Sequence, residues 1–136
     1  MTVVLDADVL IGALDSTDVH HDHSRGLFRR WRRAQTTLLV SVVTLSEVLV
    51  APAATSDRLR LALEAITALG VTIRDATERV GVDAARFRVR YPISLADGYC
   101  LATARVVGAS VASFDTKVAR AARAERIPIT PSLFGR

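Results

Sequence analysis

The sequence contains a single cysteine, a single lysine and no uninterrupted hydrophobic run of membrane-spanning length. The lone Cys100 excludes an internal disulfide, and its place in an apolar helical pattern predicts a small core residue. The longest apolar run, residues 38–50, is broken by polar side chains and falls short of the roughly 20 residues that a transmembrane helix needs. Asp6 and Asp8 interrupt the only N-terminal stretch that could pass for a signal-peptide core. We therefore expect a soluble, cytoplasmic protein without membrane contact.

Arginine replaces the missing lysine almost completely. The basic side chains are seventeen arginines and Lys117, and the net charge is +4. A guanidinium group presents a planar fork that binds phosphate with two hydrogen bonds, so this composition is typical of a protein that meets nucleic acid. An arginine bias can equally reflect codon composition, and charged helix faces are usually just solvated. Composition alone leaves both interpretations open.

The length of 136 residues and the hydrophobic pattern predict one domain, residues 1–136, of the α/β class. Short β-branched or apolar runs predict strands at residues 3–5, 37–41, 71–73 and 111–114, with a short edge strand at 127–129. Helical patterns cover residues 9–14, 19–33, 43–49, 55–69, 76–91, 94–107 and 116–126. Alternating strands and helices imply right-handed crossovers and a mostly parallel sheet. The expected architecture is a three-layer α/β/α sandwich.

The helix expected at residues 19–33 carries a basic stripe. Leu27, Trp31 and Ala34 share its apolar face. The opposite side carries four arginines: Arg25, Arg29, Arg32 and Arg33. We expect these arginines to contact RNA phosphates, although an acidic segment of a partner protein could use the same stripe.

Three histidines at the start of this helix, His20, His21 and His23, look at first like a transition-metal site. Adjacent residues on a helix point in different directions, and only His20 and His23 share a face. We therefore expect surface or packing roles for these side chains.

Several acidic residues follow strands or open helices, and each has a plain structural interpretation. Glu47 lies three residues after Thr44 and Asp97 three after Ser94, so either acid could complete a capping box. Asp8 and Asp115 could each be an N-cap. Asp6 ends a buried strand without an evident capping role, and an ionised carboxylate there needs a partner, a metal or a raised pKa.

Taken together, four of these acids are expected at one edge of the sheet. Asp6 and Asp115 follow strands, while Glu47 and Asp97 lie near the starts of helices that adjoin strands. Four carboxylates without a cationic neighbour would repel one another and raise their pKa values. Mg²⁺ or Mn²⁺ takes oxygen ligands and would resolve this conflict. An acidic metal pocket on an arginine-striped protein suggests metal-dependent hydrolysis of nucleic acid.

The same residues carry a resemblance that spans nearly the whole chain. The succession is residues 4–11 (VLDADVLI), 44–48 (TLSEV), 94–104 (SLADGYCLATA) and 113–115 (SFD). In order and spacing it resembles the PIN domain family, and within it the small VapC-type ribonuclease toxins of toxin–antitoxin systems. The resemblance implies an endoribonuclease with Mg²⁺ or Mn²⁺ held by Asp6, Glu47, Asp97 and Asp115. It also implies a homodimer and inhibition by a VapB-type antitoxin whose C-terminal segment covers the pocket.

The resemblance further assigns roles to three residues beside the acids. Thr44 and Ser113 would orient the carboxylates through their hydroxyl groups. Asp8 departs from the family pattern, in which a small polar residue is usual, and we interpret it as the cap of the following helix rather than as a fifth ligand.

Two other functions remain open at this stage. Asp6-Ala7-Asp8-Val9 after a strand also looks like the opening motif of haloacid-dehalogenase-type phosphatases, with Asp6 as the nucleophile. That family needs a lysine ahead of a downstream acidic pair, whereas Lys117 follows Asp115 and no such pair comes after it. A module that binds RNA or a partner without catalysis is the third interpretation, which the set of four acids disfavours.

Overall fold

The computed structural model describes residues 1–130, and the last six residues of the expected domain lie outside the described part. Four strands form one sheet: β1 (Thr2–Leu5), β2 (Thr37–Ser41), β3 (Val71–Arg74) and β4 (Ser110–Ala112). Their order is β3-β2-β1-β4 and every pairing is parallel. The strand expected at residues 127–129 is reduced to a single parallel bridge between Val111 and Ile129.

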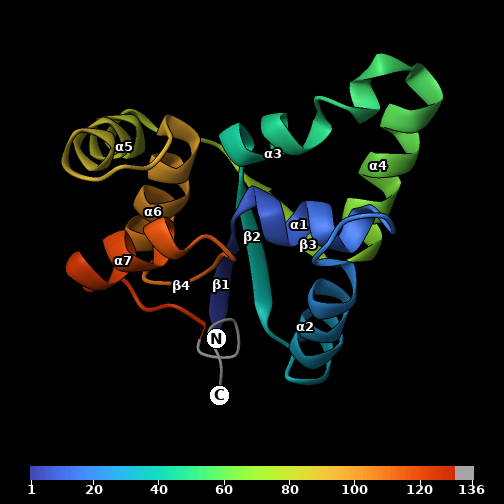
Figure 1. Ribbon diagram of the computed structural model, residues 1–136, viewed down its shortest axis with the longest axis horizontal. Coiled ribbons are helices and arrows are strands. Elements are labelled where there is room, and N and C mark those ends of the chain that lie inside the picture. Colours follow the sequence, from blue (N-terminus) through green and yellow to red (C-terminus); the bar gives the residue numbers. More distant parts are fainter. Residues whose placement is uncertain (131–136) are drawn as a thin grey trace.

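The helices alternate with the strands, as the sequence pattern predicts. They are α1 (Ala7–Leu14), α2 (His21–Arg33), α3 (Val42–Leu49), the short 3-10 helix η1 (Pro52–Ala54), α4 (Ser56–Ala68), α5 (Glu78–Arg90), α6 (Leu95–Val107) and α7 (Thr116–Ala124). Figure 1 shows α5, α6 and α7 on one side of the sheet and α1, α2 and α4 on the other.

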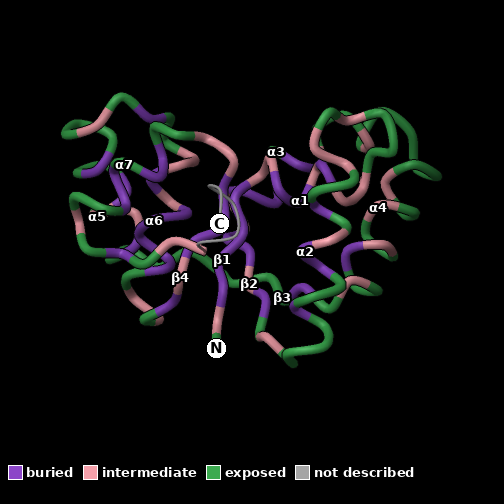
Figure 2. Tube along the Cα trace, turned by 60° about the horizontal axis from the view of Figure 1, so that its bottom comes forward, coloured by how far each residue is buried: buried purple, intermediate pink, exposed green. Residues whose placement is uncertain are grey.

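Strand β1 runs through the centre of the molecule and supplies both halves of the core (Figure 2). Val3 and Leu5 belong to one cluster, which also contains Leu27 of α2 and Ile66 of α4. Val4, which points to the other face, belongs to a second cluster with residues of α5, α6 and α7. Both sides of the sheet are therefore covered, which confirms the α/β/α sandwich.

Other details of the fold also differ from the predictions. Helix α2 begins at His21 rather than at residue 19, and Val19 is 89 % exposed. Its apolar face contains Phe28, whereas Ala34 lies at the exposed C-terminal cap. Strand β4 stops at Ala112, two residues early, because the Phe114 N–H donates to the Asp8 carboxylate instead of continuing the sheet.

No helix within residues 1–130 is long and apolar enough to span a bilayer.

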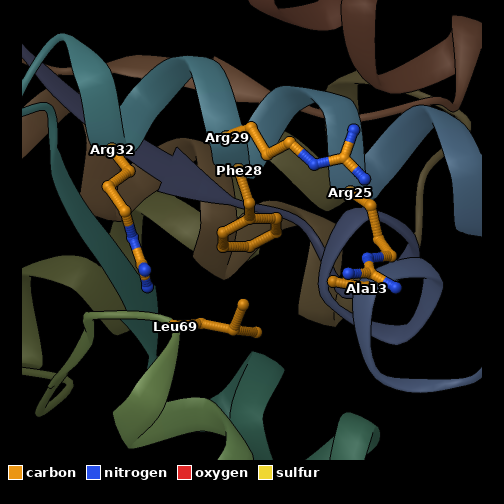
Figure 3. Close-up of a pocket in the computed structure, with 6 residues that line it drawn as sticks. All are labelled: Ala13, Arg25, Phe28, Arg29, Arg32 and Leu69. Atoms are coloured by element: carbon orange, nitrogen blue, oxygen red, sulfur yellow. The ribbon is translucent and has the colours of Figure 1, made fainter.

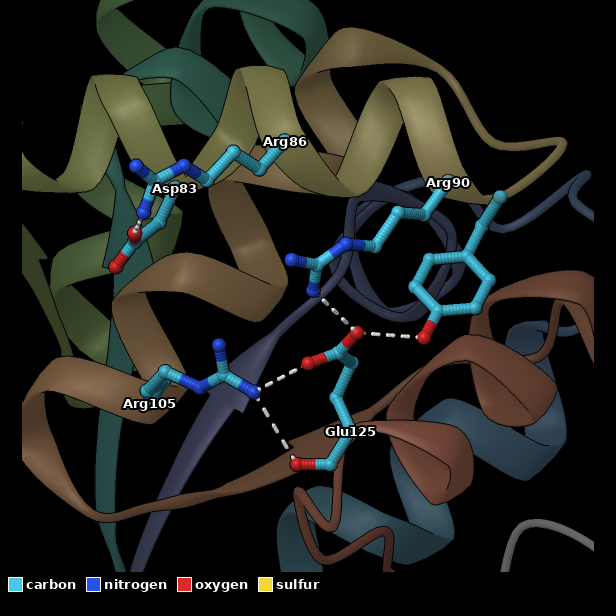
Figure 4. A network of polar contacts seen from close by, with 6 residues as sticks. Asp83, Arg86, Arg90, Arg105 and Glu125 are labelled. Atoms are coloured by element: carbon cyan, nitrogen blue, oxygen red, sulfur yellow. Dashed lines mark hydrogen bonds and ion pairs between the residues drawn. The ribbon is translucent and has the colours of Figure 1, made fainter.

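A polar network joins the three helices on the α5 side (Figure 4). The Glu125 carboxylate accepts from the Tyr91 hydroxyl at 2.5 Å, from Arg90 at 2.9 Å and from Arg105 at 2.6 Å. These bonds lower the pKa of Glu125 to about 2, the Tyr91 hydroxyl contributing most. The network fixes the end of α5 and the residue that follows α7 against α6.

Candidate functional site

Asp6 lies directly after β1, at the carboxyl end of the central strand pair. Its backbone N–H extends the ladder by donating to Ala112 at 2.9 Å. One carboxylate oxygen accepts from the Ala7 N–H at 2.9 Å, and the other accepts from the Ser113 hydroxyl at 2.7 Å. The residue is 5 % exposed. A buried carboxylate is thus held in one orientation by contacts from β1 and from the end of β4.

The segment Ser113–Asp115 connects β4 to α7 and is bound to β1 and α1 at two points. Besides its bond to Asp6, the Ser113 hydroxyl accepts from the Asp115 N–H at 3.1 Å. The Phe114 N–H donates to Asp8 Oδ2 at 3.0 Å. Asp115 caps α7 by accepting from the Lys117 N–H at 2.8 Å. Ser113 therefore makes the contact with a carboxylate that its predicted orienting role requires.

Asp97 sits in the first turn of α6 and forms a capping box with Ser94. The Ser94 N–H donates to Asp97 at 3.0 Å, and the Asp97 N–H donates to the Ser94 hydroxyl at 3.1 Å. The next residue, Gly98, packs so tightly on α5 that an added Cβ would lie 2.6 Å from the Ala84 carbonyl oxygen. The position of Asp97 therefore depends on the close approach of α5 and α6.

Helix α3 contributes Thr44 and Glu47. Thr44 is fully buried, and its hydroxyl has no hydrogen-bond partner within residues 1–130. The N-cap of α3 is Ser41, which accepts from the Val43 N–H at 3.2 Å, so the proposed capping box between Thr44 and Glu47 is wrong. Glu47 is exposed, and its pKa is raised by partial burial and by the nearby charge of Asp97.

The charges of acids on separate elements influence one another's pKa values. The pKa of Asp6 is raised from 3.8 to about 7, first by burial and then by the charges of Asp8 and Asp97, while the hydrogen bonds from Ser113 and Ala7 oppose this rise. Burial likewise raises the pKa of Asp8 to about 6. The Phe114 N–H and the His20 charge oppose that shift, while Asp115 adds to it.

Cys100 lies behind this cluster in α6 and is fully buried, which confirms the prediction of a core residue. The pKa of its thiol is raised first by burial and then by the charges of four acids: Asp6, Asp97, Asp8 and Glu47. The pKa of the Cys100 thiol is thus influenced by acids directly after β1 and on α1, α3 and α6.

The structure corrects the role predicted for Asp8 and adds a capping role to Asp6. Asp6 is the N-cap of α1, whereas Asp8 lies in the first turn of that helix and uses its side chain to hold Phe114. The interpretation of Asp8 as the cap was therefore wrong. A helix starts immediately after β1, so the residue at the strand end also has to satisfy the first free N–H group. The second oxygen of Asp8 is buried without a hydrogen-bond partner in the described chain.

The histidine cluster has packing roles, as expected. The His20 ring stacks on Phe114 with centroids 4.1 Å apart, and His23 contacts the same ring at 5.0 Å. His21 Nδ1 lies 2.8 Å from the Gly12 carbonyl oxygen, which joins α2 to α1. The contact with Phe114, which places α2 beside the acids, is the feature of the site that sequence reasoning missed.

The arginine stripe lines a pocket to which none of the four acids contributes. Arg25, Arg29 and Arg32 surround an open pocket of about 200 Å³ floored by Phe28 (Figure 3). Arg32 donates to the Ala68 carbonyl oxygen at 3.1 Å, so this side of α2 faces the end of α4. Residues two positions apart on a helix point roughly 200° apart, so Arg25 and the site-facing His23 lie on opposite flanks of α2. Arg33 is exposed and does not line the pocket.

The side chains of this site suit a hard divalent cation. All candidate ligands are carboxylates, and their mutual charges raise pKa values, a conflict that a cation relieves. A carboxylate has about four acceptor sites, so the capping bonds of Asp6, Asp97 and Asp115 do not exhaust their capacity. Within residues 1–130, no group of three histidine, cysteine, aspartate or glutamate side chains lies close enough together to hold one ion. The carboxylate groups fit such an ion chemically. To bind it, these side chains have to move closer together.

The comparisons with known proteins agree with this arrangement. The family model for the PIN domain matches residues 3–124, which includes all four acids. The chain belongs to the PIN domain family. This PIN domain has no match among curated protein sequences. Membership of the PIN domain family overturns the phosphatase interpretation of Asp6.

The fold of this PIN domain recurs in several solved structures. VapBC2 from Rickettsia felis, bound to a DNA fragment from its promoter, matches with a TM-score of 0.75 and 14 % identity over 96 % of this chain and 98 % of that one. FitAcB from Neisseria gonorrhoeae matches with a TM-score of 0.69 and 21 % identity over 97 % and 99 %. VapC20 from Mycobacterium tuberculosis, described as a sarcin–ricin loop cleaving toxin, gives 0.70 and 16 % over 88 % and 94 %.

Proposed function

We propose that this PIN domain is a metal-dependent endoribonuclease and the toxin of a VapBC-type pair. The observation that supports the activity most directly is that the charge of Asp97 on α6 raises the pKa of both Glu47 on α3 and the buried Asp6 after β1, whose pKa reaches about 7. The structural neighbours that are ribonuclease toxins or toxin–antitoxin complexes support the biological role.

Asp6, Glu47, Asp97 and Asp115 would hold Mg²⁺ or Mn²⁺, directly or through water. When bound, such an ion lowers the pKa of a water molecule and neutralises charge on a phosphodiester. Ser113 keeps the Asp6 carboxylate oriented, and Asp8 holds the backbone ahead of Asp115. Thr44 offers a buried hydroxyl on α3, from which it would orient a carboxylate.

The partner would be an antitoxin whose C-terminal segment covers the acids. A groove of about 780 Å³ lies between α1, α3 and α4, and Glu47 is part of its lining. Its walls include apolar side chains of all three helices, among them Ile11, Val48 and Leu61. A peptide segment lying in this groove would reach the acidic site at Glu47.

We also propose a homodimer formed through α5 and the start of α6. Val82, Val89 and Leu95 are 46 %, 86 % and 51 % exposed, so this side presents apolar surface that a second copy would cover. Sedimentation of the wild type beside Val89→Glu tests this: the wild type should sediment as a dimer and the variant as a monomer. A monomeric wild type would refute it.

The RNA would be bound partly through arginines. Arg25, Arg29, Arg32 and Arg33 remain the proposed phosphate contacts, although three of them line a pocket on the α4 side of α2. RNA that reaches both the acids and these arginines has to pass around α2. Binding that is unaffected by Arg25→Gln and Arg29→Gln together would show that RNA follows another path.

The proposed activity is tested by incubating purified protein with single-stranded RNA and Mg²⁺ or Mn²⁺. The wild type should produce fragments, and Asp97→Asn should not. Asp75→Asn is the matched control, because Asp75 is an exposed acid in the loop after β3. Equal cleavage by the wild type and Asp97→Asn would refute the assignment, and RNA binding without cleavage by any of the proteins would identify a binding module.

A further inference from the structure

The three residues between β4 and α7 carry two functional groups on a very short stretch of backbone. Ser113 orients Asp6 through its hydroxyl, and Asp115 is one of the proposed metal-binding acids. Phe114, between them, presents its side chain to the start of α2. Any displacement of Phe114 would therefore move both neighbours.

His20 makes the closer of the two histidine contacts with the Phe114 ring. The two rings are stacked, with centroids 4.1 Å apart and planes inclined by 21°. His23 is more distant at 5.0 Å and tilted by 43°. Stacked aromatic rings at such distances stabilise each other beyond simple burial.

His20 is itself firmly placed, so it can act as an anchor. The His20 backbone N–H donates to Asp18 Oδ2 at 2.9 Å. The His20 backbone carbonyl oxygen accepts from the Ser24 N–H at 2.9 Å at the start of α2. Helix α2 is packed closely against α1, since a Cβ on Gly12 would lie 2.4 Å from Ser24 Oγ. The ring that supports Phe114 therefore belongs to the rigid α1–α2 pair.

We propose that His20 is a positioning residue of the site: by stacking on Phe114 it fixes the Ser113–Asp115 segment and, through it, Asp115 and the Ser113 hydrogen bond to Asp6. This inference rests on the proposed ribonuclease function for its kinetic consequence. Asp8 of α1 holds the backbone N–H of Phe114, and His20, the N-cap of α2, holds its ring. The role needs an aromatic ring at position 20 and does not need an imidazole.

The first measurement is amide hydrogen exchange in the metal-free protein without RNA. In His20→Ala the Phe114 N–H should exchange about three- to tenfold faster, because a stacked pair contributes about that factor. His20→Phe restores a ring and should exchange like the wild type. Because this readout needs no catalysis, equal exchange in all three proteins would refute the positioning role even if the ribonuclease assignment is correct.

The second measurement is RNA cleavage, with kcat and KM determined separately. His20→Ala should lower kcat about tenfold with KM within about twofold, and His20→Phe should recover most of the loss. His21→Ala is the structural control: it removes the link to Gly12 and should lower the melting temperature without lowering kcat. Full activity of His20→Ala would overturn the proposal, and a His20→Phe variant as slow as His20→Ala would show that the imidazole itself is required, which also overturns it.

Phe114→Leu covers the case in which His20→Ala folds poorly. It removes the other ring of the stacked pair and keeps an apolar side chain at the same place. It should show the same faster exchange at residue 114 and the same loss of kcat. Wild-type values for both quantities would refute the proposal.

Discussion

Ser113 donates its hydroxyl hydrogen bond to Asp6 across 2.7 Å and so joins the ends of two neighbouring parallel strands, β1 and β4. Both residues are almost completely buried, at 2 % and 5 % exposure. The bond lowers the pKa of Asp6, whereas burial and the charges of Asp8 and Asp97 raise it. The carboxylate at the centre of the site is thus oriented by a hydroxyl group and kept near its point of half-ionisation at neutral pH.

Ser113→Ala should remove this orienting bond. We expect cleavage to fall by about ten- to a hundredfold, as for other residues that orient metal ligands. Stability should fall by about 1–2 kcal/mol, because a buried acceptor loses its donor. Ser46→Ala is the control, since Ser46 is exposed and bonds only within α3. A Ser113→Ala enzyme as active as the Ser46→Ala enzyme would show that the bond has no catalytic effect.

The metal-free protein should lose stability as the pH rises. The folded-state pKa of Asp6 is about 7 against an ordinary value of 3.8, so the folded state binds a proton that the unfolded state releases. The associated stability is fully present below pH about 4 and is lost as the pH rises through about 7, by roughly 4 kcal/mol for this shift. Thermal melts in chelator between pH 4 and 8 measure it.

Asp6→Asn supplies the control for that melt, because asparagine still caps a helix but does not titrate. Its melting temperature should fall less over the same pH range, although Asp8, whose pKa is raised to about 6, still titrates in the variant, and at pH 8 in chelator it should exceed that of the wild type. If the two proteins lose stability in parallel, Asp6 is not the group responsible.

Gly98→Ala should disturb the site through packing. The added Cβ would meet the Ala84 carbonyl oxygen at 2.6 Å, so α5 and α6 have to separate and Asp97 moves with α6. We expect a loss of about 1–3 kcal/mol in stability together with reduced cleavage. Gly26→Ala in α2 has nothing within 4 Å of its Cβ and should be stabilised by about 0.5–1 kcal/mol. Denaturant unfolding of both variants tests this contrast, and a Gly98→Ala protein as stable as the wild type would contradict it.

Glu125→Gln should weaken the packing of α5 and α6, the helix that carries Asp97, and lower the stability of the protein. The amide cannot form the ion pairs with Arg90 and Arg105, so we expect a loss of about 1–3 kcal/mol. Glu64→Gln, which breaks an exposed pair with Arg60 on α4, should cost less than about 1 kcal/mol. Equal melting temperatures for the two variants would mean that the Glu125 network adds no more than a surface ion pair.

The layers and the strand positions were predictable because hydrophobic periodicity decides them. Val3, Val4 and Leu5 are buried on both faces of a parallel sheet, and such strands read as continuous apolar runs. The capping box of Asp97 and the cap at Asp115 were also foreseen as local patterns. Local spacing is sufficient for such features.

The roles of Asp6 and Asp8 could not be separated from the sequence, because both lie at the junction of β1 and α1. Which of the two caps the helix depends on where the first helical turn begins, a boundary that periodicity fixes only to within a few residues. The stacking of His20 on Phe114 joins positions 94 residues apart and leaves no trace in local spacing. Contacts of this kind follow from tertiary packing alone.

The rate of RNA cleavage in chelator and after addition of Mg²⁺, measured in parallel for the wild type and Asp6→Asn, tests the central claim most directly. The wild type should be inactive in chelator and active with Mg²⁺, and Asp6→Asn should be inactive in chelator and more than about a hundredfold slower than the wild type with Mg²⁺. Cleavage by the wild type that persists unchanged in chelator, or Mg²⁺-dependent cleavage by Asp6→Asn at the wild-type rate, would contradict a metal centre built on Asp6.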